Sequence, residues 1–139
     1  MTRILAIDYG TKRIGLAVTD PLQIIATGLD TVPTNDIFEY LKKYLFAESV
    51  SKFVVGFPMH LDGSPAQLAP TIEKFVEKLN KLYPEIEVAY EDERFTSEDA
   101  KRIILQSGAK KKKRRDKGLV DKIAAVLILQ SYMERNRPY

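Results

Sequence analysis

Three acidic residues occupy positions at which the sequence predicts the end of a strand or the start of a helix. Asp8 follows an almost continuously apolar segment, Glu93 ends a second strand-like segment, and Asp121 falls in the first turn of an apolar helix. The carboxyl ends of strands form the ligand-binding edge of open α/β sheets. We therefore expect the three side chains to lie near one another at such an edge.

Three converging carboxylates predict a site for a divalent metal ion. Asp8 has the parity of Ile4 and Ala6 in its strand, so it should face a covered side of the sheet. Carboxylates that meet there would repel one another unless a cation lay between them. Oxygen ligands without cysteine suit Mg²⁺ or Mn²⁺. Two such ions can activate a water molecule and stabilise the leaving oxygen of a phosphodiester.

Each of these carboxylates also has a purely structural interpretation. Asp8 could hydrogen-bond within the turn that follows its strand. Glu93 could pair with a neighbouring basic side chain at the surface. Asp121 could simply favour the positively charged end of a helix. The three positions together are more specific than any one of them.

A cationic segment directly precedes Asp121. Seven of the eight residues from 110 to 117 are basic, and the other residues of the chain carry 15 basic and 18 acidic side chains. The seven are Lys110, Lys111, Lys112, Lys113, Arg114, Arg115 and Lys117. Such a concentration of positive charge predicts contact with a polyanion, and a nucleic acid backbone is the natural one. A solvated loop without a partner is the alternative.

Two further segments could contact a substrate phosphate. The turn after Asp8 carries Thr11 and Lys12, and Arg94 follows Glu93 directly. The turn resembles the Asp-x-Gly-Thr hairpin of actin-like kinases, but those enzymes need a second similar lobe. A nucleotide-binding protein therefore remains a weaker alternative. His60, in a loop rich in Gly, Pro and Asp, could assist proton transfer or bind phosphate.

Length and composition exclude several classes of protein. A chain of 139 residues predicts one domain, residues 1–139. The absence of cysteine excludes a disulfide scaffold, a thiol nucleophile and an iron–sulfur cluster. A single histidine excludes a multi-histidine metal site. No apolar run approaches the roughly 20 residues of a membrane span, and the N-terminus leads directly into a strand pattern, so we expect a cytoplasmic protein.

The elements that must position these residues follow one another in the order β-β-β-α-β-α-β-α-α. Predicted strands cover 3–9, 13–19, 23–32, 52–57 and 85–91, and predicted helices cover 36–47, 66–82, 97–106 and 118–135. A three-stranded antiparallel meander followed by βα units predicts a mixed five-stranded sheet with helices on both faces.

Some finer features are also predicted. Thr34 or Asn35 should cap the first helix, and Gly28 should mark an irregularity in the third strand. The inward stripe of the last helix is predicted to comprise Val120, Ile123, Ala124, Leu127, Ile128 and Ser131.

Several segments together resemble the YqgF family along essentially the whole chain. They are residues 7–15 (IDYGTKRIG), 55–58 (VGFP), 62–63 (DG), 92–97 (DERFTS) and 118–121 (GLVD), in the family's order. The resemblance implies an RNase H-like fold with a metal-binding acidic triad. Carried over residue by residue, that triad falls on Asp8, Glu93 and Asp121.

The resemblance further implies a nuclease that matures pre-16S ribosomal RNA. Mg²⁺ or Mn²⁺ would be its cofactor, and structured RNA or ribosomal precursor particles would be its partners, bound by a monomer or homodimer. A Holliday junction resolvase acting on branched DNA is one alternative. A non-catalytic nucleic-acid-binding factor in ribosome assembly or transcription is the other. Fold alone cannot choose between them.

Overall fold

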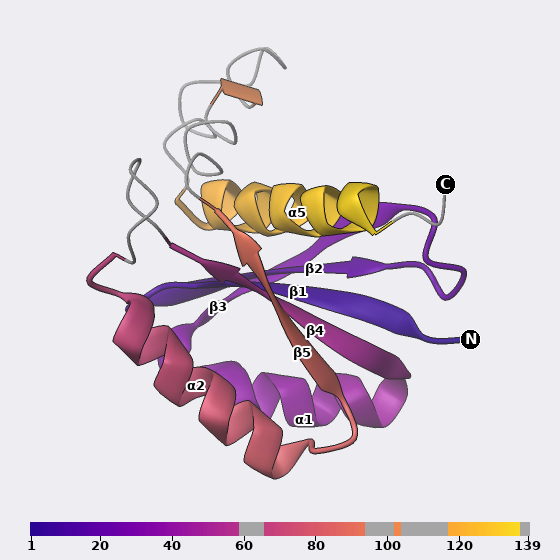
Figure 1. Cartoon of the computed structure of the whole chain (residues 1–139), viewed down its shortest axis with the longest axis horizontal. Coiled ribbons are helices and arrows are strands. Elements are labelled where there is room, and N and C mark those ends of the chain that lie inside the picture. The colour runs from indigo at the N-terminus through magenta and orange to yellow at the C-terminus, as the bar shows by residue number, and fades with distance from the viewer. Residues whose placement is uncertain (59–65, 94–101, 104–116, 137–139) are drawn as a thin grey trace.

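The structure is a computed structural model that describes residues 1–58, 66–93, 102–103 and 117–136 (Figure 1). Predictions that fall elsewhere, which include the helix over 97–106 apart from its two helical residues Arg102 and Ile103, lie outside the described residues.

Five strands, three α-helices and one 3₁₀ turn make up the described chain. The strands are β1 (Arg3–Tyr9), β2 (Arg13–Thr19), β3 (Ala26–Pro33), β4 (Val50–Phe57) and β5 (Glu87–Asp92). The helices are α1 (Ile37–Ala47), α2 (Ala69–Leu82) and α5 (Lys117–Arg135), and the 3₁₀ turn η1 (Thr34–Asp36) precedes α1. The expected order of elements is confirmed wherever the structure describes the chain.

The strands form one mixed sheet in the order β3-β2-β1-β4-β5. β1 pairs antiparallel with β2, and β2 with β3, whereas β1 pairs parallel with β4, and β4 with β5. The central position of β1 explains its continuous apolar sequence, because strands buried on both faces lose the usual alternation. The predicted irregularity at Gly28 is confirmed: Leu16 pairs with Asp30 and Ala17 with Gly28, so Leu29 is an extra residue.

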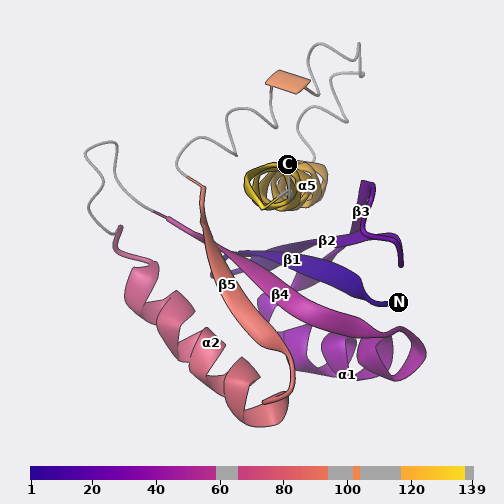
Figure 2. The same ribbon diagram turned by 45° about the vertical axis from the view of Figure 1, so that its right-hand side comes forward.

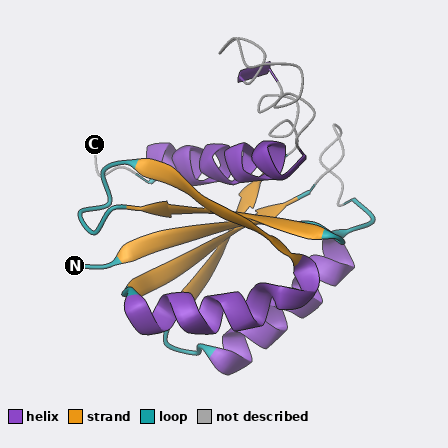
Figure 3. Cartoon of the chain, turned by 180° about the vertical axis from the view of Figure 1, so that it is seen from behind, coloured by secondary structure: helices purple, strands orange, loops and turns teal. Residues whose placement is uncertain are grey.

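Helices cover both faces of the sheet. Figure 1 shows α1 and α2 on one face and α5 on the other, and Figure 2 shows α5 nearly end-on above the strands. The view from behind in Figure 3 shows the same layers. The α1 and α2 side has large core residues such as Leu5, Ile7 and Phe53. The α5 side is lined by smaller ones, among them Ala6 and Ala17, so α5 can approach the strands closely.

The prediction for the start of α1 is wrong in detail. Neither Thr34 nor Asn35 caps α1 with its side chain, because both belong to η1 and the N-cap position of α1 falls on Asp36. The Thr34 hydroxyl instead donates to the Gly10 carbonyl oxygen at 2.7 Å and so ties the start of η1 to the β1–β2 turn.

The buried stripe of α5 is rotated from the predicted one. Its buried residues are Ala124, Ala125, Ile128, Leu129 and Tyr132, while Ser131 is exposed. Ala124 and Ile128 were predicted correctly, whereas the buried stripe continues through Ala125, Leu129 and Tyr132. The described part of α5 begins at Lys117, so Asp121 lies in the second turn rather than the first. Asp121 precedes Ala124 by three residues and therefore begins the stripe that faces the sheet.

No helix within the described residues is long and apolar enough to cross a membrane.

Candidate active site

The candidate site lies at the carboxyl ends of the three parallel strands. β1, β4 and β5 run in one direction, so Tyr9, Phe57 and Asp92 end at the same edge of the sheet. Glu93 follows β5 immediately, and its backbone N–H donates to the Phe57 carbonyl oxygen at 3.4 Å. The first turns of α5 lie over this edge in Figure 1.

Asp8 and Glu93 form a hydrogen-bonded pair at this edge. Desolvation by burial raises the pKa of Glu93 to about 10, and repulsion from Asp8 and the shared hydrogen bond act in the same direction. Burial also raises the pKa of Asp8, to about 6; the hydrogen bond to Glu93 opposes this rise, and the charge of Asp121 adds to it. Burial and mutual repulsion therefore favour one proton shared by the pair.

Gly56 provides the space that the Glu93 carboxyl occupies. A Cβ atom on Gly56 would lie 2.6 Å from Glu93 Oε2 and 2.6 Å from Ile128 Cδ1 of α5. The carboxyl group is thus packed between a strand backbone and an apolar helix side chain. This surrounding is the physical source of the desolvation that raises its pKa.

Gly15 provides the space in which the backbone of Asp121 packs against β2. Gly15 is the cross-strand partner of Asp8, and a Cβ on it would lie 2.0 Å from the Asp121 carbonyl oxygen and 3.1 Å from the Lys122 nitrogen. The backbone of α5 therefore rests directly on β2 beside Asp8. This contact brings Asp121 near enough for its charge to raise the pKa of Asp8.

We expect Gly15→Ala to destabilise the protein strongly. The new methyl group would overlap the α5 backbone, which cannot rotate away as a side chain can, so the helix must shift off the sheet. The expected loss is about 1–3 kcal/mol or more, measured by urea denaturation. Gly28→Ala is the matched control, because its Cβ would meet only the flexible Lys122 side chain, at 2.9 Å. Equal stability of the two variants would contradict this account of the packing.

Arg13 is a site residue that sequence reasoning missed. Its Nε donates to Asp121 Oδ2 at 2.8 Å, across 108 residues of sequence. A signal was present, because Arg13 lies two residues before Gly15 and so faces the same side of the sheet as Asp8. The pair is partly exposed, with side-chain accessibilities of 39% for Arg13 and 24% for Asp121.

The β5 strand is held to α5 by a second polar contact. Glu91 is buried, accepts a hydrogen bond from the Ser131 hydroxyl at 2.7 Å and forms an ion pair with Arg135. Glu91 and Glu93 share a face of the strand. This contact fixes the strand that carries Glu93 against the helix that carries Asp121.

The donor set of the three acids fits Mg²⁺ or Mn²⁺, since every available ligand is a carboxylate oxygen. The partly buried, crowded Asp8–Glu93 pair is a place where positive charge is favourable. Within the part of the chain that the structure describes, however, no three acidic or histidine side chains are grouped closely enough to hold a metal ion. Asp121 is turned toward Arg13 instead.

The other predicted substrate-binding residues fall into two groups. Thr11 and Lys12 are exposed in the β1–β2 turn, and Lys117 is exposed at the start of α5. These positions leave them accessible to a nucleic acid. Arg94, His60 and the basic residues from 110 to 115 lie outside the described residues.

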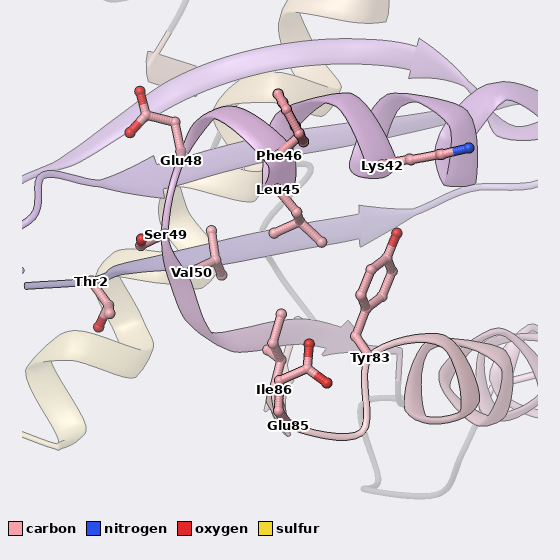
Figure 4. Close-up of a pocket in the computed structure, with 10 residues that line it drawn as sticks. All are labelled: Thr2, Lys42, Leu45, Phe46, Glu48, Ser49, Val50, Tyr83, Glu85 and Ile86. Atoms are coloured by element: carbon pink, nitrogen blue, oxygen red, sulfur yellow. The ribbon is translucent and has the colours of Figure 1, made fainter.

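A hollow of about 520 Å³ lies at the other end of the parallel strands, away from the acidic residues (Figure 4). It is lined by the end of α1, including Phe46, by Val50 at the start of β4, and by Tyr83 and Ile86 before β5. Asp8, Glu93, Asp121 and Arg13 are not among its lining residues. The hollow is therefore separate from the candidate active site.

The fold is that of the RuvC nucleases. A structure of Thermus thermophilus RuvC in complex with a Holliday junction substrate matches with a TM-score of 0.57 and 15% identity, over 97% of this chain and 96% of that one. A second Thermus thermophilus RuvC structure matches with a TM-score of 0.52 and 13% identity, over 96% of both chains. Together with the five-stranded mixed sheet, these matches confirm the RNase H-like fold that the sequence predicted.

The chain belongs to the RuvX family. The family model described as "RuvX: Holliday junction resolvase" matches residues 2–135. The "Putative pre-16S rRNA nuclease" of Porphyromonas gingivalis is 52% identical over 134 residues, which cover 96% of this chain and 97% of that protein. The protein of the same name from Flavobacterium johnsoniae is 45% identical, over 99% of both chains. These matches confirm the resemblance to YqgF, which is the same family.

Proposed function

We propose that this protein is a metal-dependent nuclease that hydrolyses phosphodiester bonds in the precursor of 16S ribosomal RNA. The observation that carries the proposal is the Asp8–Glu93 pair, with Asp121 beside it, at the ligand-binding edge of a RuvC-like sheet. Close relatives that share 45–52% of its residues along nearly their whole length are named as pre-16S rRNA nucleases.

Asp8, Glu93 and Asp121 would hold Mg²⁺ or Mn²⁺ through their carboxylate oxygens. Such an ion supplies Lewis-acid polarisation of the phosphodiester and of the attacking water. Asp8 and Glu93 must lose their shared proton to act as ligands, because a protonated carboxyl binds a cation poorly. The single domain of residues 1–139 would place Thr11, Lys12, Lys117, Arg94 and the basic residues from 110 to 115 around this edge, where they would contact the backbone phosphates.

The test compares two substrates in parallel with Mn²⁺ present. One is a structured 16S rRNA precursor and the other is a four-way DNA junction, each incubated with the wild type and with Asp8→Asn. Cleavage of the RNA that depends on Asp8 supports the proposal. Cleavage of the junction alone would favour a resolvase, the second candidate, which the description of the matching family favours.

A non-catalytic assembly factor predicts a different pattern. That protein would keep its cellular function after Asp8, Glu93 and Asp121 are neutralised, and would lose it when the basic segment is replaced by Ser and Gly. Complementation of a depletion strain with the two variants, read out as the amount of mature 16S rRNA, separates the two classes.

A further inference from the structure

The candidate site is divided into two parts in this structure, and Arg13 is responsible for the division. Asp8 and Glu93 are hydrogen-bonded to each other, whereas Asp121 is paired with Arg13 at 2.8 Å. Within the described residues, the Nε–Asp121 bond is the one hydrogen bond recorded for the guanidinium.

The pair between Arg13 and Asp121 is suited to exchange. With accessibilities of 39% and 24%, both side chains reach solvent. Partly exposed ion pairs contribute little to stability, so a divalent cation can displace the guanidinium at small cost. Arg13 is also anchored at the first residue of β2, next to the exposed turn at Thr11 and Lys12. A displaced guanidinium would therefore lie where a nucleic acid backbone is expected.

The formal charges agree with such an exchange. The three carboxylates carry −3 when all are ionised, and the paired Arg13 reduces this charge to −2, so Arg13 weakens the attraction of the site for a divalent cation. Removal of Arg13 should therefore strengthen cation binding, although it also removes a hydrogen bond from Asp121.

We propose that Arg13 is a positioning residue that competes with the divalent cation for Asp121 and, once displaced, binds a backbone phosphate of the nucleic acid. This inference rests on the proposed function, because it needs a cation at the three acids. The exchange makes cation and nucleic acid bind cooperatively. The cation frees the guanidinium for the phosphate, and the phosphate in turn keeps it away from Asp121, as reciprocal linkage requires.

The first test measures Mn²⁺ affinity by titration calorimetry, without nucleic acid. Arg13→Gln should bind Mn²⁺ on the order of tenfold more tightly than the wild type. Arg13→Lys keeps the charge and should stay close to the wild type. Lys43→Gln is the matched control, because it removes one positive charge from an exposed position on α1, on the opposite face of the sheet. Circular dichroism and urea denaturation check that each variant is folded.

The second test measures binding of a phosphorothioate-substituted RNA stem by fluorescence anisotropy, with and without Mn²⁺. Mn²⁺ should strengthen RNA binding by the wild type, and Arg13→Gln should lose most of this strengthening while its Mn²⁺ affinity is raised. Unchanged or weaker Mn²⁺ binding by Arg13→Gln overturns the inference and leaves the proposed function intact. Absence of any Asp8-dependent Mn²⁺ binding by the wild type overturns both.

Discussion

Glu93→Gln is expected to stop cleavage while it stabilises the metal-free protein. The amide cannot become an anionic ligand, so the cation loses one of its three carboxylates. Loss of a residue that only orients a metal ligand costs about 10- to 100-fold in metal affinity or activity, so we expect a loss of at least about 100-fold for a ligand itself. Mn²⁺-dependent cleavage of the rRNA precursor measures it.

The stabilisation by Glu93→Gln follows from the raised pKa of the carboxyl group. At pH 8 an unfolded Glu93 is ionised, whereas the folded protein forces it to keep a proton. Glutamine removes this conflict and keeps a donor for Asp8, so the metal-free variant should gain at least about 1 kcal/mol, the equivalent of one pKa unit. Glu77→Gln is a matched control, because it makes the same change at an exposed position on α2. A variant that is inactive and also less stable would show that the Glu93 carboxyl group stabilises the fold instead of being destabilised by its burial.

The pH dependence of stability has a definite sign. Unfolded Glu93 ionises near its ordinary pKa of 4.5, and the folded group does so near 10. The unfolded state therefore binds fewer protons between these values, and stability is full below about pH 4.5 and falls as pH rises toward 10. Asp8 adds a change of the same sign between 3.8 and about 6. Urea midpoints of the metal-free wild type should fall across this range, and those of Glu93→Gln should fall much less.

Neutralising the basic segment is expected to change the salt dependence of RNA binding. Replacing four of the residues from 110 to 115 by glutamine should flatten the slope of log K against log salt concentration by up to about 3–4 units, if each side chain contacts a phosphate. The effect on affinity should be large at low salt and small at high salt, because released counterions drive this binding. Fluorescence anisotropy at several salt concentrations measures the slope.

A charge-matched variant provides the control for this measurement. Lys42, Lys43, Lys74 and Lys81 are exposed on α1 and α2, on the face of the sheet opposite α5. Their replacement by glutamine changes the net charge by the same amount but should leave the slope almost unchanged. Equal slopes for the two variants would show that the overall charge of the protein, and not the basic segment, governs binding.

Much of the site was predictable from the sequence. The parity of Asp8 in an apolar strand places it on a covered face of the sheet. Glu93 follows the end of a strand parallel to that of Asp8, so both residues lie at the same edge of the sheet. The alternation of small residues in the strands, such as Ala6 and Ala17, also indicates the face on which a helix approaches closely. These inferences are local, because a strand has a fixed period of two residues.

Only the tertiary structure determined which group each carboxylate contacts. A helix can present any of several stripes, and the apolar residues of the last helix fit more than one of them, so the predicted stripe differs from the buried one. The choice depends on the backbone contact between Gly15 and Asp121, which joins residues more than 100 positions apart. The pairing of Asp121 with Arg13 and the proton shared by Asp8 and Glu93 have the same origin. Distances and desolvation exist only after the elements have packed, so the sequence alone determined which residues carry the charge and the packed fold determined their partners.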